Sequence, residues 1–219
     1  MSSAGEPVPG DALLDFLDDM RRLRRECPWK REQTHRSLAR YLQEEAAETV
    51  EAIDTGDGDH LREELGDLLL QVYFHAVIAE ESGTFTIDDV ASGISEKMHR
   101  RNPHVFGSDG SPTTLTAGEV DRQWQQIKAS ERLDRIDDAG EPSPYDGIAP
   151  SLPALLLATK ILERLPAAGS APADAGDTSA DLGDRLLALV GEAVASGADP
   201  EQALRDAVRR AAERSTDGS

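Results

Sequence analysis

Apolar residues recur every three or four positions through the first 135 residues, which is the spacing of amphipathic helices. This repeat predicts five helices, over residues 11–26, 34–53, 59–82, 86–101 and 117–135. No segment shows the convincing two-residue alternation of a strand. The pattern therefore predicts an all-α protein, a bundle of helices joined by short connections.

Turn and capping residues separate these helices. Pro28 interrupts the pattern after the first helix, because proline disfavours helical backbone in the residue before it. Thr34 is placed to cap the second helix, and the segment TGDGD (55–59) supplies a turn with capping aspartates. Thr86 with Asp89 three residues later resembles a capping box, so we expect the fourth helix to begin there.

The composition changes after residue 135. Residues 137–151 are rich in proline and glycine, 152–165 form another amphipathic segment, and 166–181 are of low complexity and predicted to be disordered. The segment DLGDRLLALV (181–190) repeats the pattern of ELGDLLLQVY (64–73). We predict a disordered start (1–10), a helical domain (11–136), a linker (137–151) and a degenerate second copy (152–219) without the first acidic pair.

The net charge of −19 excludes nucleic-acid polymers and anionic membranes as favoured partners, because the field of the whole protein repels both. A phosphate ligand stays compatible, since a bound divalent cation inverts the local field. The single cysteine, Cys27, cannot form a disulfide within the chain. With no secretory signal and no run of about 18 apolar residues, the sequence predicts a cytoplasmic protein.

Two groups of carboxylates have the spacing of a shared helix face. Glu44 and Glu45 lie four and three residues before Glu48, and Glu64 lies three residues before Asp67. The apolar residues beside them are expected to face the core: Leu42, Ala46, Val50, Leu65, Leu68 and Leu69. The carboxylates would then meet near the interior of the bundle.

Unpaired anions in an interior are strongly disfavoured, and a hard divalent cation resolves that conflict. All-oxygen ligands favour Mg²⁺ or Mn²⁺ over zinc. Either acidic group alone is equally typical of a solvated face, whereas both together on consecutive helices favour a metal site. A di-iron site is disfavoured because neither Glu45 nor Glu64 has a histidine three residues later, and His75 is interpreted as an ordinary bundle residue.

Basic and aromatic residues follow the acidic helices. Lys97 and Arg101 are four residues apart, as are Trp124 and Lys128. The cations could hold phosphate oxygens or complement the dipole at a helix end. Trp124 could stack on a base or pack in the bundle, and Trp29 is a second candidate for a ring that contacts a base.

The order of these motifs resembles the MazG nucleoside triphosphate pyrophosphohydrolases. The resemblance covers residues 11–135 and, weakly, 152–214. It is carried by CPWKREQTH (27–35), EEAAE (44–48), ELGDLLLQV (64–72), EKMHRRNPHVFG (96–107) and WQQIKASER (124–132). The combination is highly specific, although EExxE alone is weak.

This resemblance implies an all-α fold, a homodimer, and Mg²⁺-dependent hydrolysis of NTPs or dNTPs to monophosphate and pyrophosphate in nucleotide-pool housecleaning. It implies metal binding by Glu45, Glu48, Glu64 and Asp67, with Glu44 assisting Glu45 in catalysis. It further implies nucleotide contacts by Lys97, Arg101, Trp124 and Lys128. Some members have a lysine where this chain has Tyr41, which leaves that phosphate contact open.

The expected mechanism places Mg²⁺ between the carboxylates and the triphosphate, where it lowers the pKa of an attacking water. Glu44 or a metal-bound carboxylate orients this water toward the α-phosphorus, and the cations neutralise the departing pyrophosphate. The alternative is a non-catalytic helical interaction module whose acidic face binds a basic partner or Ca²⁺. No EF-hand spacing supports calcium.

Overall fold

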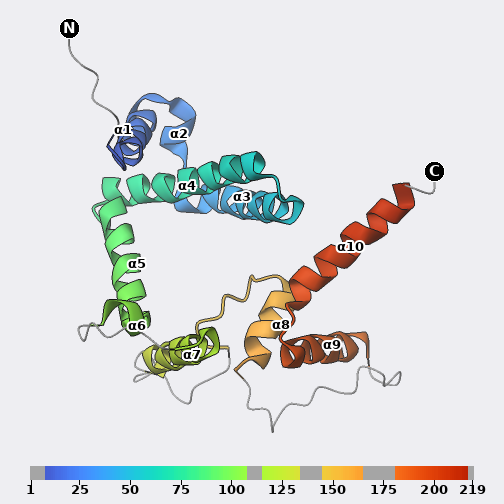
Figure 1. The fold of residues 1–219 in the computed structure, drawn as a ribbon. Helices are drawn as coiled ribbons and strands as arrows, with labels where there is room; N and C mark the ends of the chain where they lie inside the picture. The colour runs from blue at the N-terminus through green and yellow to red at the C-terminus, as the bar shows by residue number, and fades with distance from the viewer. Residues whose placement is uncertain (1–7, 108–114, 134–144, 165–180, 217–219) are drawn as a thin grey trace. The chain divides into compact units, whose positions relative to one another are not determined.

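The computed structural model describes residues 8–107, 115–133, 145–164 and 181–216, and all regular structure within these ranges is helical (Figure 1). The prediction of an all-α protein is confirmed. The chain divides into two compact units, Met1–Leu115 and Thr116–Ser219. The domain boundaries expected from the sequence stay a prediction. The expected disordered segments 1–10 and 166–181 lie almost wholly outside the described residues.

The first unit is built around one antiparallel pair of long helices. Its helices are α1 (Asp11–Glu26), α2 (Pro28–Glu32), α3 (His35–Thr55), α4 (Gly58–Glu81), α5 (Ile87–Arg101) and α6 (Pro103–Phe106). Figure 1 shows α3 and α4 side by side, with α1 and α2 at one end of the pair. Gly56, with φ of 72°, ends α3 in the left-handed conformation that glycine adopts without strain.

Local hydrogen bonds fix where these helices begin. Thr34 and Ser37 form a reciprocal capping box at the start of α3. Asp57 accepts hydrogen bonds from the first amides of α4, and Thr86 with Asp89 forms the capping box expected for α5. The predicted positions of these three helix starts are therefore confirmed.

The core of the first unit lies where α1 crosses α3 and α4. Its buried residues are Leu17, Met20, Leu38, Tyr73, Phe74 and Val77. At the edge of this core, the buried guanidinium of Arg24 donates to Glu81 of α4 and to the carbonyls of Lys30 and Gln33. A single side chain of α1 thus holds both α4 and the α2 segment.

Two expectations about the first unit are wrong. Leu42 and Leu65, expected in the core, are 39% and 51% exposed, and Ala46 is exposed as well. Periodicity identifies an apolar helix face but not whether the chain itself covers it. The sequence also predicted only a break after Glu26 and no helix between Arg101 and residue 117, whereas the short helices α2 and α6 form there, each with proline at its start.

The second unit contains α7 (Ala117–Leu133), α8 (Ala154–Leu162), α9 (Leu182–Ser196) and α10 (Pro200–Thr216). Helices α8, α9 and α10 contact one another, and Ala188 and Val190 of α9 are buried. The helix expected over residues 117–135 is present as α7, and the amphipathic segment 152–165 contains α8. In the part of the chain that the structure describes, no helix is long and apolar enough to cross a membrane.

Candidate metal centre

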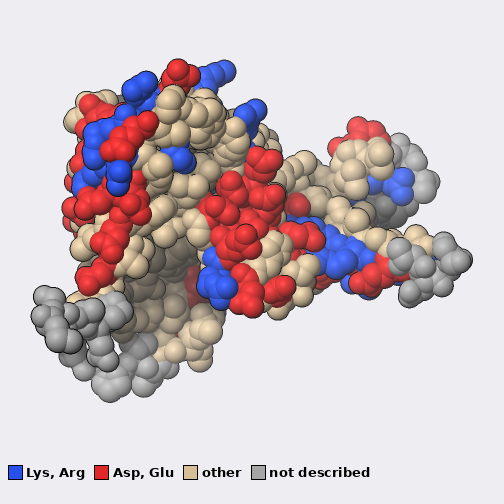
Figure 2. Space-filling model, turned by 90° about the horizontal axis from the view of Figure 1, so that it is seen from above, with Lys and Arg blue, Asp and Glu red and all other residues tan. Residues whose placement is uncertain are grey.

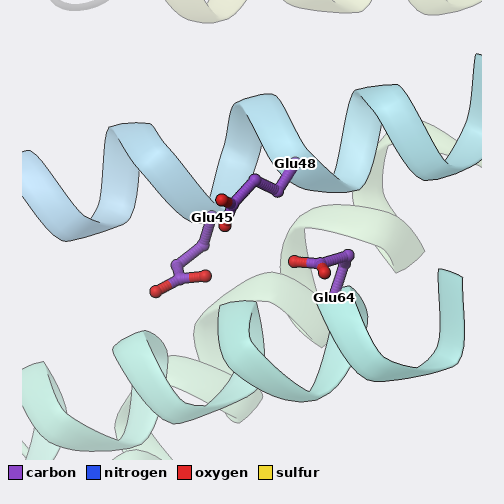
Figure 3. A group of neighbouring side chains, drawn as sticks. All are labelled: Glu45, Glu48 and Glu64. Atoms are coloured by element: carbon purple, nitrogen blue, oxygen red, sulfur yellow. The ribbon is translucent and has the colours of Figure 1, made fainter. Parts of the chain in front are cut away.

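Three carboxylates from α3 and α4 converge in the first unit. Glu45 and Glu48 of α3 and Glu64 of α4 each offer an oxygen, and these oxygens lie within 4.8 Å of one another. Figure 3 shows Glu45 extending from α3 toward α4, with the Glu64 carboxylate lying between the two helices. Glu64 is only 9% exposed, whereas Glu48 is exposed and Glu45 is half-buried. The group therefore opens to solvent on the side of α3.

The local packing brings these backbones together. Thr49, one turn after Glu45, is buried between the helices at 6% exposure. Its hydroxyl donates to the Glu45 carbonyl at 2.7 Å and lies 3.5 Å from the Glu64 carbonyl. A short side chain at this position allows α3 and α4 to approach closely, which places acidic residues of both helices in one group.

The carboxylates of this group repel one another, and a bound cation would offset that repulsion. Burial raises the pKa of Glu45 above its usual range, and the negative charges of Asp67, Glu48 and Glu64 raise it further. Several hard oxygen donors, one of them on a buried side chain, are the donor set that Mg²⁺ and Mn²⁺ prefer. The residues present therefore fit a hard divalent cation.

The other predicted acidic residues lie around this group. Asp67 is half-buried and close enough for its charge to act on Glu45, although it is outside the group of three. Glu44 is exposed on α3. Its catalytic role and the metal contact of Asp67 stay predictions.

The predicted nucleotide-binding cations fall in both units. Lys97 and Arg101 are half-buried in the last turns of α5, in the same unit as the carboxylates. Trp124 and Lys128 belong to α7 of the second unit, where the Lys128 ammonium lies 4.3 Å from the centroid of the Trp124 ring. The four-residue spacing of this tryptophan and lysine thus brings them into contact, and their contacts with nucleotide stay a prediction.

Trp29 lines an open cavity of about 590 Å³ at the junction of α2 and α3. Its ring is half-exposed and meets the edge of Tyr41, with 6.2 Å between centroids. The cavity lining is aromatic, hydroxylic and basic: Trp29, Gln33, Thr34, Arg36, Ser37, Arg40 and Tyr41. Such a lining suits an anionic ligand that carries a ring.

Sequence reasoning missed two basic residues of this cavity and one beside the carboxylates. Arg36 and Arg40 are one turn apart on α3, and the Arg40 guanidinium lies 4.5 Å from the Tyr41 ring centroid. Their i, i+4 spacing just before EEAAE is the signal that could have identified them. His60 was also missed, although it precedes Glu64 by four residues, and its Nε2 lies 3.1 Å from the Glu64 carboxylate.

His75, interpreted from the sequence as an ordinary bundle residue, contacts a second histidine. Its Nδ1 lies 2.7 Å from Nδ1 of His35, and the two rings are stacked. Burial lowers the pKa of His75, and the proximity of His35 lowers it further. The neutral form that this favours lets one ring donate to the other.

The surface reflects the strong negative charge of the chain. On the face drawn in Figure 2, acidic side chains form broad areas and basic side chains form smaller groups between them. A polyphosphate approaching such a surface requires local cations, either basic side chains or a bound metal.

Comparison with known proteins identifies the relatives of this chain. A model of the MazG nucleotide pyrophosphohydrolase domain matches residues 33–106, which include all three carboxylates. An uncharacterised 26.1 kDa protein of Streptomyces cacaoi is 44% identical over 96% of this chain and 85% of its own length. The nucleoside triphosphate pyrophosphohydrolase/pyrophosphatase MazG of Thermotoga maritima is 39% identical over 86% of this chain and 77% of its own length. Among solved structures, a mazG-related protein from Thermotoga maritima aligns at 25% identity with a TM-score of 0.45, covering 54% of this chain and 98% of that chain.

The fold and the site define an all-helical protein with a carboxylate centre suited to a hard divalent cation. The sequence matches then place it: the chain belongs to the MazG nucleotide pyrophosphohydrolase family. This membership confirms the resemblance identified from the motifs, and with it the expectation of a hydrolase that acts on acid anhydrides.

Proposed function

We propose that the chain hydrolyses nucleoside triphosphates, ribo or deoxy, to the monophosphate and pyrophosphate in a Mg²⁺-dependent reaction. The observation that carries this proposal is the convergence of Glu45, Glu48 and Glu64 from two helices onto one point. Asp67 completes the proposed metal site. Mn²⁺ is expected to replace Mg²⁺, because both accept an all-oxygen ligand set. The proposed biological role is nucleotide-pool housecleaning in the cytoplasm.

In the proposed reaction, the oxygen of water bonds to the α-phosphorus as the bond from that phosphorus to the α,β-bridging oxygen breaks. Pyrophosphate leaves with the electrons of the broken bond. Bound at the carboxylates, Mg²⁺ would neutralise phosphate charge and acidify the water. Glu44 and Glu45 orient the water and accept its proton, while Lys97, Arg101 and Lys128 hold phosphate oxygens.

The cavity at Trp29 supports a matching site for the rest of the nucleotide. Ser37 and Tyr41 line it, and they precede Glu45 by eight and four residues, so all three share one face of α3. At 1.5 Å per residue, Tyr41 is only about 6 Å along the helix axis from Glu45. We propose that Trp29 contacts the base there. Trp124 of the second unit is a separate candidate for a ring that contacts a base.

The test is a panel of ribo-, deoxy- and oxidised nucleoside triphosphates with Mg²⁺, Mn²⁺ or EDTA. We expect monophosphate and pyrophosphate in equal amounts, with no release in EDTA. In ¹⁸O-labelled water the label should enter the monophosphate, because the α-phosphorus is attacked. Release of orthophosphate and diphosphate would contradict the proposal. No release from any nucleotide would favour a non-catalytic acidic interaction module.

We further propose that the chain acts as a homodimer through the exposed apolar faces of α3 and α4. Leu42 and Ile53 are eleven residues apart on α3, and Leu65 and Val72 are seven apart on α4, so each pair shares a helix face. All four side chains are between 39% and 58% exposed. A second copy of the same face would remove this apolar surface from water.

Replacing Val72 by glutamate should weaken the dimer at least roughly tenfold, because a charge in an apolar interface is desolvated without a partner. Val105 of α6 is 63% exposed and lies outside α3 and α4, so Val105→Glu is the matched control. Sedimentation equilibrium should show a dimer for wild type and Val105→Glu, and a shift to monomer for Val72→Glu. A monomeric wild-type chain would contradict the dimer.

A further inference from the structure

A histidine holds one oxygen of the most buried carboxylate of the metal centre. Nε2 of His60 lies 3.1 Å from Oε1 of Glu64, one helical turn later on α4. The Glu64 side chain is 11% exposed, whereas the His60 side chain is 40% exposed. The imidazole therefore approaches Glu64 from the solvent side and makes a close polar contact with a carboxylate that water barely reaches.

His60 is itself held in place by the start of α4. The Asp57 side chain accepts hydrogen bonds from the backbone amides of Asp59 and His60, at 3.0 and 3.1 Å. This cap fixes the backbone of His60 in the first turn of the helix. The Cβ atom of His60 is thus held at a defined point relative to Glu64.

A contact of this kind changes how the Glu64 carboxylate can present its oxygens to a cation. A carboxylate has two oxygens and rotates about its terminal torsion, which is broad and poorly fixed by itself. The contact of His60 with Oε1 restricts this rotation and favours Oε2 as the oxygen that a metal would meet. Outer partners of this kind orient metal ligands, and their loss typically weakens metal affinity or activity about 10–100-fold.

We propose that His60 is a positioning residue of the metal centre, which orients Glu64 toward Glu45 and Glu48. This inference rests on the proposed function, since it assumes that these carboxylates bind a divalent cation. The competing interpretation is an ordinary i, i+4 pair that stabilises α4 without affecting the metal. The two interpretations predict different results when His60 is replaced. Loss of a positioning residue weakens the binding of the cation to the metal-free protein, whereas loss of a helix-stabilising pair leaves this affinity unchanged.

The experiment is calorimetric titration of Mn²⁺ into the metal-free full chain, at one pH, for four proteins. These are wild type, His60→Ala, His60→Gln and the control Arg22→Ala. Arg22 forms a similar i, i+4 pair with Glu26 on α1, at 3.0 Å and well exposed, so its loss removes a helix pair away from the carboxylates. Circular dichroism and thermal unfolding in EDTA verify that all four are folded.

We expect His60→Ala to weaken Mn²⁺ binding roughly tenfold, with Arg22→Ala unchanged. His60→Gln should bind within about threefold of wild type, because its amide can donate to the same oxygen across one turn. Turnover of His60→Ala should return to the wild-type rate at high Mg²⁺. The substitution is expected to raise the Mg²⁺ concentration needed for activity and to leave the rate at saturating Mg²⁺ unchanged. Equal Mn²⁺ affinity in wild type and His60→Ala would overturn the role of His60 alone. A wild-type chain that binds no Mn²⁺ would overturn the proposed function and the role of His60 together.

Discussion

Replacing Glu64 by glutamine is expected to lower kcat/KM for nucleoside triphosphates by roughly a thousandfold, about 4 kcal/mol of transition-state stabilisation. Glutamine keeps the size of the side chain and one acceptor oxygen but removes the negative charge. Glu64 is the most buried of the three converging carboxylates, so water cannot easily take its place as a ligand. The measurement is pyrophosphate release at saturating Mg²⁺.

The matched control for this prediction is the neighbouring residue. Glu63→Gln makes the same chemical change at an exposed position of α4 outside the converging group. It should retain turnover within about twofold of wild type, because surface substitutions away from a site act weakly. Both variants should keep wild-type helix content by circular dichroism. Equal turnover in Glu64→Gln and Glu63→Gln would remove Glu64 from the metal site.

The loss of the Glu64 charge should also affect the thermal stability of the metal-free protein. Burial and like charges raise the pKa of Glu45, so the folded state without a cation holds repelling carboxylates. Removing the charge of Glu64 relieves part of that repulsion. We therefore expect Glu64→Gln in EDTA to unfold at the same temperature as wild type or higher, which separates lost activity from lost stability.

The helices could be predicted from the sequence because their signals are local. Thr34 and Asp57 cap their helices through bonds to amides two or three residues away, and Gly56 adopts a positive φ at the end of α3. The prolines were the exception. Pro28 was interpreted only as a break, but proline also favours the first turn of a new helix, where its missing amide costs nothing, as at Pro28 and Pro103.

The candidate site could be predicted only in part. Helical spacing alone places Glu45 and Glu48 on one face, and the structure brings Glu64 to them. Spacing does not determine which apolar faces the chain covers, and for that reason Leu42 and Leu65 were wrongly placed in the core. Contacts that depend on packing between distant segments, such as the His35–His75 pair, leave no local pattern to detect.

The buried Arg24 shows how packing of the fold supports the cavity at Trp29. Its guanidinium is 7% exposed and pairs with Glu81, whose pKa it holds below the usual range. It also donates to the carbonyls of Lys30 and Gln33, at the end of the short helix that carries Trp29. No hydrophobic residue of α2 is buried, so these bonds to its backbone are a principal attachment of that helix.

Arg24→Ala is therefore expected to reduce the free energy of unfolding by about 3 kcal/mol, because it leaves a carboxylate and two carbonyls without their partner. The estimate is at the lower end for a buried pair, since the Glu81 side chain is 46% exposed. Arg21 offers a matched control one turn earlier on α1. It pairs with Glu80 at 2.7 Å, but both side chains are about one-third exposed, and Arg21→Ala should cost less than about 1 kcal/mol.

The kinetic consequence distinguishes a local effect from general unfolding. Measured below its unfolding temperature, Arg24→Ala should raise KM several-fold with little change in kcat, because α2 and Trp29 shift while Glu45 and Glu64 on the long helices do not. Urea unfolding and steady-state kinetics on Arg24→Ala and Arg21→Ala test both parts. A variant with lower stability and unchanged KM would show that the bonds of Arg24 hold α1 to α4 but do not position Trp29.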